Sequence, residues 1–96
     1  MATQKPVCRD VQAYLKFHLG KNWSAPLTGT DWRAFAAFCH LVDLWCTTES
    51  PHAEEAMRQT LKVCQSSVLP IFYHAAAGIT MESTAERLWP RIKPKE

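Results

Sequence analysis

The segment from Thr28 to about Cys46 constrains the fold most, because its apolar side chains would cover nearly every face of a helix. The residues that follow the helical period are Phe35, Phe38, Cys39, Val42, Trp45 and Cys46, and the other faces are filled by Ala34, Ala37, Leu41 and Leu44. A helix that is apolar nearly all round needs neighbours on several sides. We therefore expect this helix at the centre of a helical bundle. It should begin at Thr28, which has capping-box spacing to Asp31, or at Thr30, and it should end at about Trp45 or Cys46.

An amphipathic helix is predicted before this segment, from Pro6 to Leu19, where apolar residues recur at three- and four-residue steps. Gly20 can adopt the left-handed conformation that ends many helices. Residues 21–27 are expected to form a loop whose Trp23 and Leu27 are held against the core, because a small protein rarely leaves such side chains fully exposed.

Three more helices are predicted after the central segment, and the first two are defined by prolines. Ser50 and Pro51 form a strong start signal, since serine caps free backbone N–H groups and proline suits the first helical turn. Pro70 should end or kink that helix, because proline lacks a backbone donor and clashes with the preceding turn. A short new helix is expected over residues 70–77, with Gly78 closing it.

The last predicted helix starts at Thr80 or Ser83 and ends at Pro90, with Ala85, Leu88 and Trp89 turned inward. Together these segments predict an all-α fold, a compact four- or five-helix single domain around a central apolar helix. The domain would span residues 1–96, with a short flexible N-terminus (1–5) and a basic C-terminal tail (90–96).

The composition excludes several classes of protein. With 47% hydrophobic and 21% charged residues, the chain should fold, and a net charge of +2 is too small to imply a polyanion partner over the whole surface. The three glycines form no phosphate-binding loop. No apolar run is long enough to span a membrane and no secretory signal is recognisable, so we expect a cytoplasmic protein without a membrane partner.

The four cysteines, Cys8, Cys39, Cys46 and Cys64, fall within predicted helices and are expected to be reduced thiols that pack as small hydrophobic groups. No CxxC or HxxxH pair is present, so we expect no metal and no cofactor. Cys64 and His74 could meet in the fold as a nucleophile and base. A place on an apolar stripe would raise the pKa of Cys64, however, and no glycine-rich turn offers an oxyanion hole, so we assign no catalytic residue and no enzymatic activity.

Residues 70–93 resemble a helix-turn-helix unit around the central HAAAGIT. In that interpretation the nucleic-acid-binding residues are Ser83, Arg87, Arg91 and Lys93. Glu82 and Glu86 would face the phosphates unfavourably. A helix-turn-helix DNA-binding transcriptional regulator is therefore the alternative hypothesis.

The preferred hypothesis rests on an excess of aromatic side chains for so small a protein. Phe17, Trp23, Trp32 and Tyr73 lie at the edges of their apolar stripes, where aromatic residues often anchor a partner. A protein partner and a homodimer would both use such a surface. We expect a non-enzymatic binding protein, such as an inhibitor or accessory factor of the kind that phages and mobile elements encode.

Overall fold

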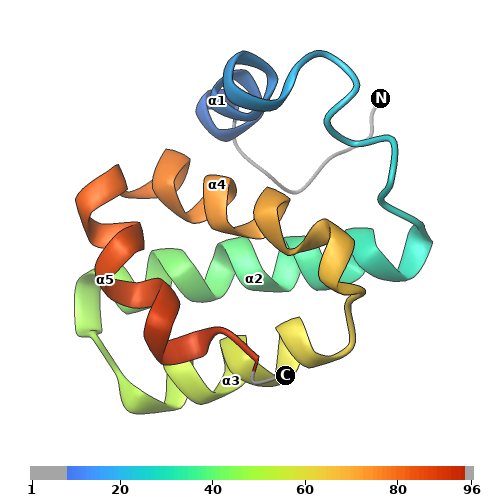
Figure 1. The fold of residues 1–96 in the computed structure, drawn as a ribbon. Coiled ribbons are helices and arrows are strands. Elements are labelled where there is room, and N and C mark those ends of the chain that lie inside the picture. Colours follow the sequence, from blue (N-terminus) through green and yellow to red (C-terminus); the bar gives the residue numbers. More distant parts are fainter. Residues whose placement is uncertain (1–8, 95–96) are drawn as a thin grey trace.

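The computed structural model describes residues 9–94, and over this range every regular element is helical (Figure 1). The elements are α1 (Arg9–Leu19), α2 (Gly29–Thr48), α3 (Pro51–Lys62), a short 3-10 turn η1 (Ser66–Val68), α4 (Leu69–Ile79) and α5 (Glu82–Ile92). The predicted all-α class and helix number are confirmed. The expected flexible residues 1–5, the start at Pro6 and Cys8 lie outside the described range.

The predicted end of α1 and the predicted starts of α2 and α3 are confirmed, whereas α2 continues to Thr48, beyond its predicted end at Trp45 or Cys46. The Thr28 N–H donates to the Asp31 carboxylate at 3.0 Å, and the Asp31 N–H donates to the Thr28 hydroxyl at 3.5 Å, which completes a capping box. The Ser50 hydroxyl accepts from the His52 N–H at 3.1 Å, with Pro51 in the first turn. Gly20 ends α1 with a φ of 92°, a conformation that glycine adopts without strain.

α4, and not α2, is the apolar helix with the most neighbours. It packs against α1, α2 and α5, whereas α2 packs mainly against α3 and α4 (Figure 1). The reason is local composition: the buried face of α4 includes Ala75, Ala76 and Ala77, whose small side chains let other helices approach closely. On α2, Leu44 keeps 49% of its surface exposed. α2 nevertheless has neighbours on more than one side, as expected, because both α3 and α4 pack against it.

The core forms where α2 meets α4. Phe38 and Val42 are fully buried, as predicted, and the rings of Phe35 and Phe38 meet Phe72 of α4 edge to face at centroid distances of 5.4 and 5.2 Å. Trp45 is also buried. Its indole N–H donates a hydrogen bond to the Glu54 carboxylate at 2.9 Å, so this buried polar group is satisfied.

None of the helices over residues 9–94 is long and apolar enough to cross a membrane.

One predicted stop signal and one predicted start signal in the second half of the chain are wrong. Gly78 does not close α4 but lies inside its last turn, where an added Cβ would be 3.2 Å from Tyr14 of α1. Its absent side chain thus permits close helix packing. Neither Thr80 nor Ser83 caps α5, because Met81 holds the N-cap position without a side-chain bond and the Thr80 hydroxyl donates back to the Ala76 carbonyl at 2.7 Å.

The predicted C-terminal tail is also shorter than expected. Pro90 is exposed within α5, and the helix continues to Ile92, which is fully buried. Proline removes only one backbone donor, and the burial of Ile92 offsets that cost. Only Lys93 and Pro94 of the described tail follow the helix.

Candidate functional site

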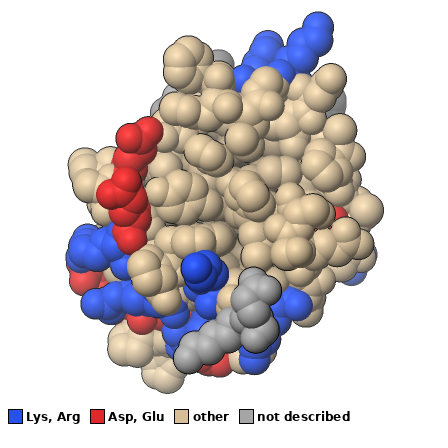
Figure 2. Space-filling view, in the orientation of Figure 1, with Lys and Arg blue, Asp and Glu red and all other residues tan. Residues whose placement is uncertain are grey.

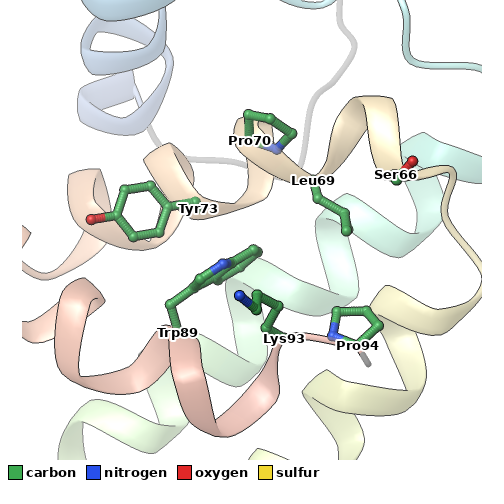
Figure 3. A pocket seen from close by; sticks show the side chains of 7 residues that line it. All are labelled: Ser66, Leu69, Pro70, Tyr73, Trp89, Lys93 and Pro94. Carbon is green, nitrogen blue, oxygen red and sulfur yellow. The ribbon is translucent and has the colours of Figure 1, made fainter. Parts of the chain in front are cut away.

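A cleft of about 440 Å³ lies between α4 and α5, beside η1. Its lining residues are Ser66, Leu69, Pro70, Tyr73, Trp89, Lys93 and Pro94 (Figure 3). This volume falls within the range of roughly 300 to 1,000 Å³ that is typical of ligand sites in proteins. We refer to it below as the α4–α5 cleft.

An aromatic pair from two helices forms the centre of the α4–α5 cleft. Tyr73 and Trp89 meet edge to face, with ring centroids 5.4 Å apart and an interplanar angle of 77°. Figure 3 shows Trp89 rising from α5 toward α4, with Tyr73 on one side of it and Leu69 and Lys93 on the other. Both rings are only partly buried, so each offers apolar surface to a ligand.

Lys93 provides the charge of the cleft. Its backbone N–H donates to the Trp89 carbonyl at 2.8 Å, which keeps the residue one helical turn beyond Trp89. Its side chain extends toward the Trp89 ring (Figure 3). No carboxylate is among the lining residues, and within the described range no acidic side chain forms an ion pair with Lys93.

The remaining polar groups of the cleft can all donate a hydrogen bond. They are the hydroxyls of Ser66 and Tyr73 and the indole N–H of Trp89. None of the three makes a side-chain hydrogen bond to another described residue. The cleft therefore combines apolar walls with one cation and several free donors.

The Tyr73–Trp89 pair continues into a row of ring contacts across three helices. The contacts are Phe17–His18 on α1 at 5.0 Å, His18–His74 at 5.7 Å, His74–Tyr73 on α4 at 5.5 Å and Tyr73–Trp89 at 5.4 Å. We call these five residues the aromatic band. Figure 2 shows a broad area without charged side chains over α1 and α4, with acidic groups at its left edge and basic groups mainly below it.

Of the two histidines of the band, His74 lies in a partly desolvated setting, whereas His18 is exposed. Burial lowers the pKa of His74, the neighbouring His18 lowers it further, and Glu82 opposes both effects. The Nδ1 atom of His74 is buried without a hydrogen-bond partner among the described residues. Tyr14 donates to the Glu82 carboxylate at 2.9 Å, and the pKa of Tyr14 is raised by desolvation first and by Glu82 second.

The four predicted partner-binding residues do not form a single site. Phe17 is 83% exposed and Tyr73 is partly buried, and both belong to the aromatic band. Trp23 and Trp32 instead contact each other at 5.8 Å, and both contact the buried Phe35. This second pair holds the loop after α1 against the start of α2, as predicted for Trp23.

The predicted nucleic-acid-binding residues are placed on α5 and just after it, but the two arginines contact other helices. Arg91 pairs with Glu54 of α3 at 3.1 Å, while Arg87 lies 4.0 Å from Glu49 and 5.6 Å from the Trp45 ring. Ser83 is exposed at the start of α5. Lys93 lines the α4–α5 cleft, whereas neither arginine does.

The described cysteines differ in their surroundings. Cys39 is buried, Cys64 is partly buried and Cys46 is exposed, so the expectation of packed thiols is wrong for Cys46. Partial desolvation raises the pKa of Cys64 and, although Cys46 is exposed, that of Cys46 as well, and nearby carboxylates add to each shift.

The candidate pair of Cys64 and His74 has separate surroundings. The Cys64 thiol donates to the Thr60 carbonyl at 3.6 Å, and the charge of Asp31 helps to raise its pKa. The His74 ring lies instead beside His18 and Tyr73. No contact joins the two side chains among those found in the described part of the chain. Over the same residues, no group of three or more His, Cys, Asp or Glu side chains could hold a metal ion.

Comparison of the chain with models of protein families, with curated proteins and with solved structures found no match. The pairing of Tyr73 with Trp89 could not be predicted from the sequence, where Trp89 was expected in the core. The contact between His18 and His74 was missed as well. Both depend on how α4 packs against α5 and α1, and no local spacing encodes that geometry. The position of Trp89, four residues before Lys93 and therefore about one helical turn from it, is the signal that could have indicated a site there.

Proposed function

We propose that this chain is a non-enzymatic binding protein that acts on a larger protein partner through the aromatic band and the α4–α5 cleft. The observation that carries the proposal is the continuous row of five aromatic and imidazole rings that leads from exposed Phe17 to the cleft. Interface centres are typically rich in aromatic residues and poor in charge. An inhibitory or accessory role in the cytoplasm is part of this proposal.

The aromatic band suits a protein partner better than the phosphates of DNA. Arg87 and Arg91, which the helix-turn-helix hypothesis needs, are engaged with Glu49 and Glu54. Binding to phosphate would have to break or share these contacts, and exposed Glu82 and Glu86 would oppose it. DNA binding is therefore our second hypothesis. Steep weakening of duplex binding with salt would support it.

Affinity purification with matched variants tests the proposal. The wild type, Phe17→Glu and Leu44→Glu serve as baits in cells that encode the protein. Phe17 is 83% exposed on the band, and Leu44 is 49% exposed on α2, so the control places the same charge on another apolar surface position. We expect one protein to be retained by the wild type and Leu44→Glu and lost with Phe17→Glu.

Two outcomes would overturn the proposal. One is equal retention of the same protein by both glutamate variants, which would place the interface elsewhere. The other is turnover, in which one chain processes many target molecules. Light scattering of the purified protein identifies a second copy as the occupant if the molar mass doubles in the wild type and returns to that of a monomer in Phe17→Glu.

A further inference from the structure

We infer that the α4–α5 cleft recognises an acidic segment of the partner protein, which places a large apolar side chain against Trp89 and a carboxylate beside Lys93. The inference rests on the proposed function and names the chemistry of the segment bound there. It follows from the charge of the cleft, the character of its walls and its open shape.

Charge complementarity selects an acidic ligand. Two arginines outside the cleft lining already have carboxylate partners: Arg58 of α3 pairs with Glu55 at 2.7 Å, and Arg91 of α5 pairs with Glu54 at 3.1 Å. Lys93 is the lysine that lines the cleft, and no described carboxylate pairs with it. A carboxylate supplied by a ligand would therefore meet a cation that is not already paired, next to hydroxyl and indole donors that are free.

The apolar walls select a bulky side chain. Leu69, Pro70 and Pro94 line the cleft on either side of the Trp89 ring, and Tyr73 packs edge to face against that ring. A partly exposed tryptophan offers a large rigid surface with little loss of side-chain freedom on binding. A segment with charge alone would leave these walls in water, so its affinity would be lower.

The shape of the cleft favours a peptide segment over a small enclosed molecule. Its described lining comes only from η1, α4, α5 and the two residues that follow α5, and nothing from α1, α2 or α3 covers it. Small-ligand sites usually bury most of the ligand surface. A groove between two helices that stays open on its outer side instead allows a chain to continue past it toward the uncharged area over α4 (Figure 2).

The test is an NMR titration of the ¹⁵N-labelled protein with three synthetic peptides. The first has a central phenylalanine flanked by glutamates, the second has lysines in place of the glutamates, and the third has alanine in place of the phenylalanine. We expect the first peptide to shift the indole N–H signal of Trp89 and the amide of Lys93. The other two should bind at least about tenfold more weakly, the factor that corresponds to ~1.4 kcal/mol.

Charge reversal at Lys93 provides the decisive variant, because this side chain is exposed and its replacement leaves the core intact. Lys93→Glu should lose the acidic peptide and gain the lysine peptide. The matched control is Lys21→Glu, an exposed position in the loop after α1 that does not line the cleft. This control should bind all three peptides as the wild type does.

The inference is wrong if no peptide shifts Trp89, if the alanine or lysine peptide binds as well as the first, or if the two charge-reversed variants behave alike. The affinity purification described above separates this failure from that of the proposed function. In that case the partner is retained by the wild type and lost with Phe17→Glu while none of the peptides binds. That result rules out recognition of an acidic segment and leaves the proposed binding function in place.

Discussion

Replacing Phe38 with alanine tests the described core most severely. Phe38 lies on α2 with no exposed surface, and its ring meets Phe72 of α4 edge to face at 5.2 Å. Loss of a fully buried phenylalanine costs about 3 to 5 kcal/mol through lost transfer energy and the cavity that remains. A domain of this size has a total stability of only about 5 to 15 kcal/mol, so the change removes a large share of it.

The expected readout is a large fall in the melting temperature. One kcal/mol shifts the midpoint of a 60- to 100-residue domain by roughly 4 to 8 °C, so Phe38→Ala should lower it by at least about 12 °C. Urea unfolding followed by circular dichroism gives the free energy independently. Leu44→Ala is the control on the same helix, since half of Leu44 is exposed, and it should shift stability by about 1 kcal/mol or less.

A Phe38→Ala protein that melts within a few degrees of the wild type would refute this reasoning. Such a result would mean that α2 does not bury this face against α4 in solution. A double-mutant cycle with Phe72→Ala adds a second check. The two rings touch, so their effects should be non-additive, with a coupling of about 0.5 to 1.5 kcal/mol.

Three further predictions concern pH, helix capping and the thiols. Burial lowers the pKa of His74 below 6.5 in the folded protein, so between that lowered pKa and pH 6.5 the unfolded chain binds more protons than the folded one. Stability should therefore fall as the pH drops through 6.5. Replacing His74 with glutamine should reduce this fall, and replacing the exposed His52 with glutamine should not. Thr28→Ala should lower the free energy of unfolding in urea by about 1 kcal/mol, whereas Thr30→Ala, which removes a threonine that does not cap the helix, should lower it less. Alkylation under denaturing conditions without reductant should modify all four cysteines, and a mass showing fewer adducts would reveal a disulfide.

The features that could be predicted from the sequence are those determined within one turn of helix. The side chains of Thr28, Asp31 and Ser50 satisfy backbone N–H groups only a few residues away, and Pro51 suits the first turn because it has no N–H to satisfy. These residues therefore define the starts of α2 and α3 wherever the helices pack. Gly20 ends α1 for the same kind of reason. Burial of Phe38 and Val42 followed from the apolar period alone.

The wrong predictions share a different cause, which is packing between distant segments. Gly78 has the residue type of a helix stop, but Tyr14 of α1 needs the space that its missing side chain leaves. Pro90 also suggests a stop, yet α5 continues because Ile92 is buried in the core. In both cases tertiary contacts override a local preference.

The candidate site depends on packing to a still greater extent. Phe17, Tyr73 and Trp89 come from three helices, and only the contacts of α4 with α1 and α5 bring their rings into one band. Phe17 and Tyr73 could be predicted as edge aromatics from their apolar stripes. Trp23 and Trp32 have the same pattern but form a separate pair, because stripe edges on different helices cannot be matched without their packing geometry.

Isothermal titration of the purified partner with wild-type protein and Tyr73→Phe or Tyr73→Ala tests the binding claim most directly. Tyr73 joins the imidazoles of the band to Trp89 in the α4–α5 cleft. We predict saturation at a fixed molar ratio, little change with phenylalanine, and a loss of more than about 1 kcal/mol with alanine. Wild-type affinity in Tyr73→Ala, with its fold intact by circular dichroism, would contradict the account.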